Sequence, residues 1–130
     1  MTPEDIALVR ESLRLLGPGM EAFGAVFYNR LFETNPALRD VFPGNLDSQK
    51  RALAAMLELI VKMLDMRDKL VPLIRYLGER HQALHVKPEY YAPFGETLIW
   101  TLDSFLREDF TPPMRRAWEE AYAFMADNMK

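Results

Sequence analysis

The chain has 130 residues, enough for one domain with a buried core, and its net charge of −3 gives no basic excess for binding nucleic acid or an anionic membrane surface. It contains no cysteine, which excludes disulfides, thiolate metal ligands and cysteine nucleophiles. The N-terminus lacks a basic and apolar leader, and the most apolar run, residues 52–64, contains Glu58 and Lys62 and is too short to span a bilayer. We therefore expect one cytoplasmic domain over residues 1–130.

Apolar residues at steps of three and four, bounded by capping residues, glycine and proline, predict helices along the whole chain. No segment alternates between apolar and polar residues at a period of two, so the predicted fold class is all-α. The expected helices cover residues 3–16, 20–34, 36–42, about 48–65, a segment ending shortly after residue 81, 88–107, and a last segment beginning at residue 112.

Local signals predict most of the helix ends. Thr2 and Thr111 are expected caps, each followed by proline at the first helical position. Asp47 or Ser48 is the expected cap of the fourth helix, after a loop at residues 43–45. The start of the fifth helix stays open, because Pro72 removes a backbone hydrogen bond unless it lies in the first turn.

The segment at residues 77–95 contains both histidines of the chain. His81 is predicted to point inward near the end of its helix, just before a tight corner and a new helix beginning at Pro88. An inward imidazole needs a partner, and in an all-helical chain without cysteine the alternatives are haem iron and an ordinary core hydrogen bond. The apolar face that carries His81 also contains Leu70, Ile74, Leu77 and Leu84.

Two polar residues lie among apolar ones on the second and fourth predicted helices. A core tyrosine such as Tyr28 needs a partner for its hydroxyl group. Gln49 is the one polar member of its apolar stripe, and a buried amide without a partner is strongly unfavourable. A ligand pocket would give both side chains something to bond, and hydrogen bonds within the core are the alternative.

Five segments, in order and at compatible spacings, make the chain resemble the globins. The resemblance is to single-domain bacterial haemoglobins and the globin part of flavohaemoglobins, with neuroglobin-like globins next. It implies a globin fold of about seven helices around a pocket for haem b. The matching segments are residues 27–32, 35–42, 48–53, 77–95 and 117–122.

The resemblance also implies roles for individual residues. His81 corresponds to the iron ligand, with Nε2 on the metal and Nδ1–H bonded to a carbonyl of its own helix. His85 is expected to be a surface group or a neighbour of a haem propionate, and the alternative is that it replaces His81 as the ligand. Tyr28 and Gln49 correspond to residues that face the bound gas, with Leu53 as the apolar wall. The remaining implied haem contacts are Phe42, Leu53, Leu77, Val86, Tyr91 and Phe94.

A ferrous haem beside two hydrogen-bond donors predicts tight, reversible binding of O₂ for storage, scavenging or supply, with CO and NO as further ligands. A nitric oxide dioxygenase working with a separate reductase is the second reading, and a haem-based gas sensor is the third. The alternative without a cofactor is a helical domain that binds other proteins and contains no haem. In flavohaemoglobins a glutamate of the last helix interacts with the tyrosine that corresponds to Tyr91. That glutamate has no counterpart within these 130 residues, so the influence of Tyr91 on His81 stays open.

Overall fold

The computed structural model describes residues 1–42 and 44–130, and these residues form six α-helices, four short 3-10 helices and no strand. The α-helices are α1 (Pro3–Leu16), α2 (Met20–Thr34), α3 (Asp47–Lys62), α4 (Arg67–Ala83), α5 (Tyr91–Leu106) and α6 (Pro112–Met129). The 3-10 helices are η1 (Gly17–Gly19), η2 (Pro36–Val41), η3 (Pro88–Tyr90) and η4 (Arg107–Asp109). The all-α prediction is therefore confirmed, and the expected third helix is the 3-10 helix η2. The loop expected at residues 43–45 includes Pro43, which lies outside the described residues.

The predicted caps of the first and last helices are present. The Thr2 hydroxyl accepts the Asp5 N–H at 3.1 Å, and the Asp5 carboxylate accepts the Thr2 N–H at 3.1 Å. Thr111 accepts the Met114 N–H at 3.4 Å at the start of α6. Each cap satisfies backbone donors that have no partner within the first turn of a helix.

Two helix starts differ from the prediction. Neither Asp47 nor Ser48 caps α3; instead, the Asn45 Oδ1 accepts the Asp47 N–H at 2.7 Å. Asparagine commonly makes this bond to the backbone two residues ahead, so the signal lay two to three residues before the expected cap. α4 begins at Arg67 and continues through Pro72, which lies beyond the first turn. Pro72 is exposed, so water can bond the carbonyl group that proline leaves without a partner.

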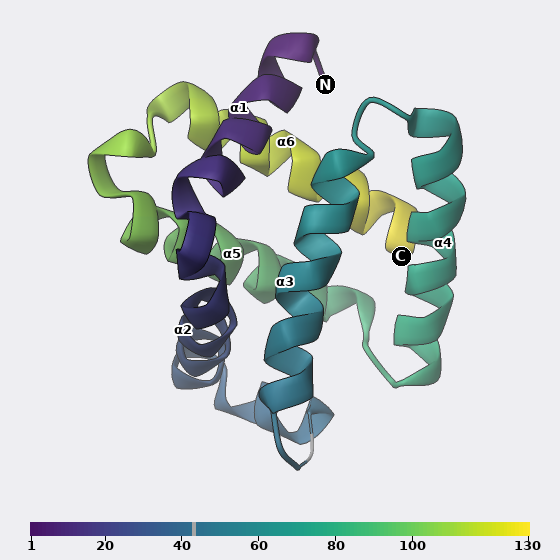
Figure 1. The fold of residues 1–130 in the computed structure, drawn as a ribbon. Coiled ribbons are helices and arrows are strands. Elements are labelled where there is room, and N and C mark those ends of the chain that lie inside the picture. Colours follow the sequence, from purple (N-terminus) through teal and green to yellow (C-terminus); the bar gives the residue numbers. More distant parts are fainter. Residues whose placement is uncertain (43) are drawn as a thin grey trace.

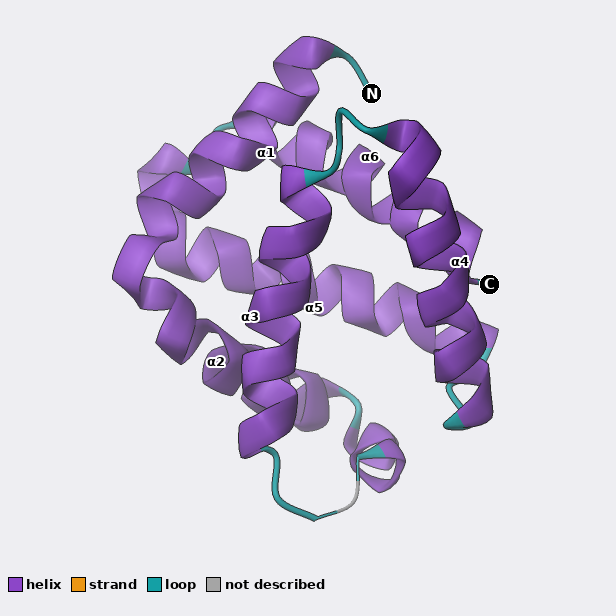
Figure 2. Cartoon of the chain, turned by 45° about the vertical axis from the view of Figure 1, so that its right-hand side comes forward, coloured by secondary structure: helices purple, strands orange, loops and turns teal. Residues whose placement is uncertain are grey.

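α3 and α4 pack against different helices and not closely against one another. The extensive contacts of α3 are with α2 and α1, whereas those of α4 are with α6. Figures 1 and 2 show α3 and α4 as two upright helices, with α5 crossing behind α3. Described residues include no helix with the length and apolar character needed to cross a membrane.

A continuous apolar core joins the first and last helices. Trp118 of α6 is fully buried, and its Nε1–H donates to the Ser12 Oγ of α1 at 2.7 Å. The Ser12 hydroxyl in turn donates to the Val9 carbonyl at 2.6 Å, so both buried polar groups are satisfied. The other large side chains with almost no exposure are Phe23, Phe27, Leu31, Leu70, Ile74 and Leu102.

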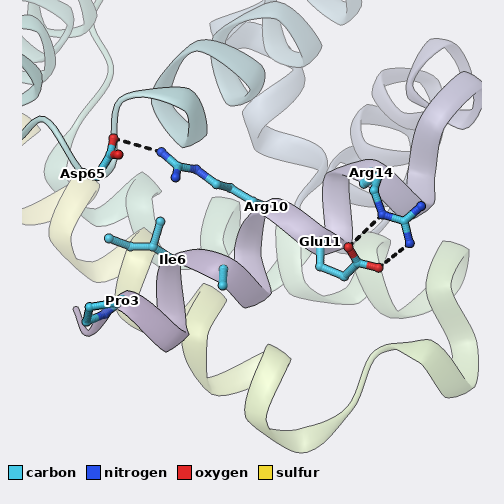
Figure 3. A pocket seen from close by; sticks show the side chains of 7 residues that line it. Pro3, Ile6, Arg10, Glu11, Arg14 and Asp65 are labelled. Atoms are coloured by element: carbon cyan, nitrogen blue, oxygen red, sulfur yellow. Dashed lines mark hydrogen bonds and ion pairs between the residues drawn. The ribbon is translucent and has the colours of Figure 1, made fainter.

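A shallow hollow of about 520 Å³ lies between α1 and the end of α3 (Figure 3). Arg10 reaches across it, with Nη2 at 3.1 Å from the Lys62 carbonyl oxygen and at 2.9 Å from the Asp65 Oδ1. Glu11 and Arg14 pair along α1 at 2.5 Å. These charges neutralise one another, and none of the residues implied for haem binding lines the hollow. We interpret it as a structural contact between α1 and α3.

Candidate functional site

His81 lies near the end of α4 and is half-buried. Its Nδ1 is 2.5 Å from the Leu77 carbonyl oxygen, one turn earlier in the same helix. A carbonyl oxygen only accepts hydrogen bonds, so Nδ1 carries the proton and the lone pair of the neutral ring is on Nε2. The expected bond to a carbonyl of its own helix is therefore present, and it leaves Nε2 suited to bind a metal.

His85 is exposed and has a left-handed backbone with φ of 65°. It occupies the position after the end of α4 where the chain reverses, and the bonds there are those of a Schellman motif. The His85 N–H donates to the Gln82 carbonyl at 3.0 Å, and the Val86 N–H donates to the His81 carbonyl at 2.9 Å. This turn fixes Val86 beside the end of α4 and places the His85 side chain at the surface, as expected.

Tyr28 and Gln49 come together although they lie on different helices. Tyr28 of α2 is only 3% exposed, and burial raises the pKa of its phenol, while the nearby polar side chain of Gln49 on α3 lowers that pKa by a smaller amount. The phenol therefore stays protonated at neutral pH and remains a hydrogen-bond donor. Gln49 itself is exposed, so the expectation of a buried amide is wrong. It lies in the first turn of α3, where the surrounding helices do not cover it.

A glycine on α2 explains why these two side chains meet. A Cβ atom added to Gly24 would lie 2.7 Å from the Lys50 carbonyl oxygen and 2.9 Å from the Lys50 Cα. Only glycine lets the α2 backbone approach α3 this closely. Tyr28 is one turn after Gly24 and Gln49 directly precedes Lys50, so the crossing sets the distance between them.

Replacing Gly24 with Ala is expected to destabilise the protein by about 1–3 kcal/mol, because the new methyl group meets backbone that cannot move aside cheaply. Helix propensity alone would give the opposite sign, since alanine favours a helix over glycine. Chemical denaturation measures the change. Gly19→Ala is the matched control, because its Cβ would make only an ordinary contact of 3.7 Å with the Phe105 ring. Equal stability of the two variants would contradict the close crossing.

Aromatic rings continue from Tyr28 toward the start of α5. The ring centroids of Tyr28 and Phe42 are 5.4 Å apart, and those of Phe42 and Phe94 are 5.8 Å apart. Phe42 and Phe94 are half-buried against the core, and so are Leu53 and Leu77. Val86, the remaining apolar residue that the resemblance implies for haem contact, is also half-buried.

Tyr91 is more deeply buried than these half-buried apolar residues, because other side chains of the fold cover it. Its ring centroid lies 6.5 Å from that of His81, and burial raises the pKa of its phenol. The Tyr122 hydroxyl of α6 donates to the Tyr91 carbonyl at 2.5 Å, and the Lys130 Nζ lies 5.8 Å from the Tyr91 ring centroid. Tyr122 ends the last of the segments that resemble the globins, and a buried tyrosine hydroxyl group needs a partner, but the sequence does not indicate which one.

One further expectation about α4 is wrong. Leu84 was placed on the inward face with His81, but it is 65% exposed. α4 ends at Ala83 and the chain turns at Leu84 and His85, so helical spacing no longer applies there. The inward face of α4 therefore ends at His81.

Protein side chains alone do not provide a complete metal site. Among residues 1–42 and 44–130 no group of three histidine, cysteine or acidic residues could hold a metal ion. A single imidazole with a free Nε2 fits a metal that brings most of its own ligands, as iron in a porphyrin does. The half-exposed apolar residues of α3, α4 and α5 fit the porphyrin faces, because α3 and α4 do not pack closely on one another.

Comparison with known proteins agrees with this geometry. The Globin family model matches residues 25–129. The chain is 31% identical to a flavohaemoprotein of Vibrio cholerae over 131 residues, which cover 97% of this chain and 33% of that protein. It is 30% identical to neuroglobin-2 of Oncorhynchus mykiss over 144 residues, which cover 99% of this chain and 90% of that protein. The chain therefore spans about a third of the length of the flavohaemoproteins it matches.

Two solved structures share the fold. An engineered carbene transferase, made from a Rhodothermus marinus protein proposed to be a nitric oxide dioxygenase, superposes with a TM-score of 0.86 at 28% identity over 98% of this chain and 89% of that one. A hexacoordinated haem protein from an anhydrobiotic tardigrade superposes with a TM-score of 0.89 at 17% identity, over 99% of this chain and 92% of that one. The second likeness concerns the fold alone.

Proposed function

The chain belongs to the globin family, and from this premise we propose that residues 1–130 form one globin domain that binds haem b through His81 and holds O₂ reversibly and tightly. The observation that carries the proposal is the buried Tyr28 hydroxyl beside Gln49, at the close crossing of α2 and α3 that Gly24 permits. Two hydrogen-bond donors from different helices meet in a part of the fold that is otherwise lined by apolar and aromatic residues.

The residues present fit the cofactor. His81 offers Nε2 to iron, because Leu77 already occupies its Nδ1–H. Phe42, Leu53 and Phe94 provide apolar surface for the porphyrin, and Leu77 and Val86 extend that surface beside His81. When bound, haem supplies ferrous iron, which binds O₂ and makes it partly negative.

Tyr28 and Gln49 act on that negative charge. The Tyr28 hydroxyl stays protonated because burial raises its pKa, and the Gln49 amide is a donor at any pH. A hydrogen bond to a charged acceptor contributes about 1.5–3 kcal/mol, which is roughly ten- to a hundredfold in affinity. CO acquires less charge and gains less from the same donors. The pair therefore favours retention of O₂ over its rapid release.

Nitric oxide dioxygenation is the second function that the comparisons favour, since one solved relative is proposed to have this activity and others are flavohaemoproteins. It requires bound O₂ and also re-reduction of the iron after each turnover. A separate reductase is the partner this activity would need. One reaction of the O₂ complex with NO is expected of almost any globin, so sustained turnover is the discriminating quantity.

We expect steady-state NO consumption to be slow when the purified holoprotein is supplied with a generic flavin reductase and NADH. The reason is that a reductase which is not attached to the globin must dock anew for every turnover, and a generic reductase docks only briefly. An NO electrode measures the rate, and a flavohaemoglobin under the same conditions is the control. Turnover comparable to that of the flavohaemoglobin would make the enzyme the better assignment.

A further inference from the structure

A second hollow, of about 410 Å³, lies between α5 and α6 on a part of the molecule that the proposed function does not use. Its more buried lining includes Gly95, Ile99 and Tyr122. At its edge, Trp100 is 39% exposed, and the Arg30 guanidinium lies 4.4 Å from its ring centroid. A half-exposed tryptophan at the edge of a hollow with both apolar and charged lining is typical of an anchor for a protein partner.

The charge around this hollow is acidic. Glu96, Asp103 and Glu119 line it together with one cation, Arg115. Arg115 lies 4.0 Å from Asp103, whereas no ion pair of Glu96 or Glu119 occurs among the residues that the structure describes. A surface with two uncompensated carboxylates attracts and orients a partner with a basic surface.

The same hollow is connected to His81 by short steps. Tyr122 lines the hollow, and its ring lies so close to Gly95 that a Cβ there would be 2.6 Å from it. The Tyr122 hydroxyl donates to the Tyr91 carbonyl at 2.5 Å, and the Tyr91 and His81 ring centroids are 6.5 Å apart. One hydrogen bond and one pair of neighbouring aromatic rings therefore link the hollow between α5 and α6 to the proposed iron ligand.

We propose that the α5–α6 hollow is the docking surface for a flavoprotein electron donor with a basic contact surface, and that this donor re-reduces the iron held at His81. The inference rests on the proposed function, because only ferrous haem holds O₂, and iron(III) formed by loss of superoxide or by reaction with NO must be re-reduced before it can bind O₂ again. The reduced flavin loses one electron, iron(III) becomes iron(II), and no bond forms or breaks at the metal. Electron-transfer encounters bury less than about 1,200 Å² in total, so a small hollow with one anchor and a charged edge is sufficient.

Cross-linking tests the docking surface independently of haem. The holoprotein is mixed with a lysine-rich ferredoxin–NADP⁺ reductase, and a carbodiimide couples carboxylates to lysines that touch them. Mass spectrometry should locate the cross-links at Glu96 and Glu119. Cross-links located elsewhere, or none at all, would overturn the proposal. Cross-linked pairs of this chain through the same carboxylates would show that the hollow joins two copies and would equally overturn it.

Reduction kinetics provide the second measurement. Glu96→Gln with Glu119→Gln should slow reduction of iron(III) by the NADPH-supplied reductase at least about fivefold at low ionic strength, and high salt should remove the difference. Reduction by photoreduced deazaflavin, a small donor that needs no docking surface, should be unchanged. Glu21→Gln with Glu58→Gln is the matched control, since both residues are exposed on α2 and α3, away from the hollow.

The two proposals fail in different ways. Normal haem and O₂ spectra combined with equal reduction rates in the two double variants would contradict the docking surface alone. A wild-type protein that takes up no haem would contradict the proposed function, and the cross-links would then decide separately whether the hollow binds a basic partner.

Discussion

Replacing His81 with Ala is expected to abolish haem retention during purification. His81 offers the one half-buried imidazole, and its Nε2 is free because Nδ1–H is bonded to the Leu77 carbonyl. Without it the described residues contain no other half-buried imidazole, because His85 is exposed. The visible spectrum of the purified variant measures the loss. Far-ultraviolet circular dichroism shows whether the helices remain, and added imidazole should partly restore the haem spectrum of a folded variant.

His85→Gly is the matched control for His81→Ala. Glycine keeps the left-handed backbone that His85 adopts at φ of 65°, so the turn and the Val86 N–H bond to the His81 carbonyl are preserved. The haem spectrum of this variant should be nearly unchanged, and its stability should be equal or higher. Loss of haem in His85→Gly with retention in His81→Ala would reverse the ligand assignment.

The rate of O₂ dissociation is expected to rise by roughly ten- to a hundredfold in Tyr28→Phe, because the variant removes one hydrogen bond to a charged acceptor and little else. Phenylalanine keeps the ring, and so preserves the contacts of Tyr28 with Phe27, Phe32 and Phe42. Stopped-flow displacement of O₂ by CO measures the rate. The CO dissociation rate of the same variant should change much less.

Gln49→Leu should raise the O₂ dissociation rate by less than Tyr28→Phe, since Gln49 is exposed and water weakens its bond. The double variant should depart from additivity, because the two donors lie near one another and serve one ligand. Unchanged O₂ release in both single variants would rule out the proposed role of the pair.

The positions of most helices could be predicted from the sequence because their ends depend on local chemistry. Thr2 and Thr111 cap the helices that follow them, and proline sets the first turn in both cases. The hydrogen bond between His81 and the Leu77 carbonyl is local in the same sense, since both residues belong to one turn of α4. At the start of α3 the sequence predicted a cap at Asp47 or Ser48, whereas Asn45 bonds the Asp47 N–H, so the predicted position was wrong by about two residues.

Other features of the site depend on contacts between helices, which spacing along one helix does not contain. The sequence placed Tyr28 and Gln49 on two inward faces, but it did not show that these faces meet or that Gln49 is exposed. The same holds for the bond between Tyr122 and Tyr91, which joins α6 to α5. A helical period gives the direction of each side chain relative to its own axis only.

The chain by itself determined an all-α protein with one inward imidazole, because caps, breakers and helical periodicity act within a few residues. Tertiary structure alone decided how closely the helices approach. At Gly24 the missing Cβ lets α2 reach the Lys50 backbone, and at Gly78 a Cβ would lie 2.2 Å from the Met129 carbonyl oxygen of α6. These contacts hold α3 on α2 and α4 on α6, and so keep the helix of Gln49 apart from the helix of His81. The physical reason is that a missing Cβ shortens the distance between two helices only where the backbone of a second helix packs against the glycine. That second helix comes from a distant part of the sequence.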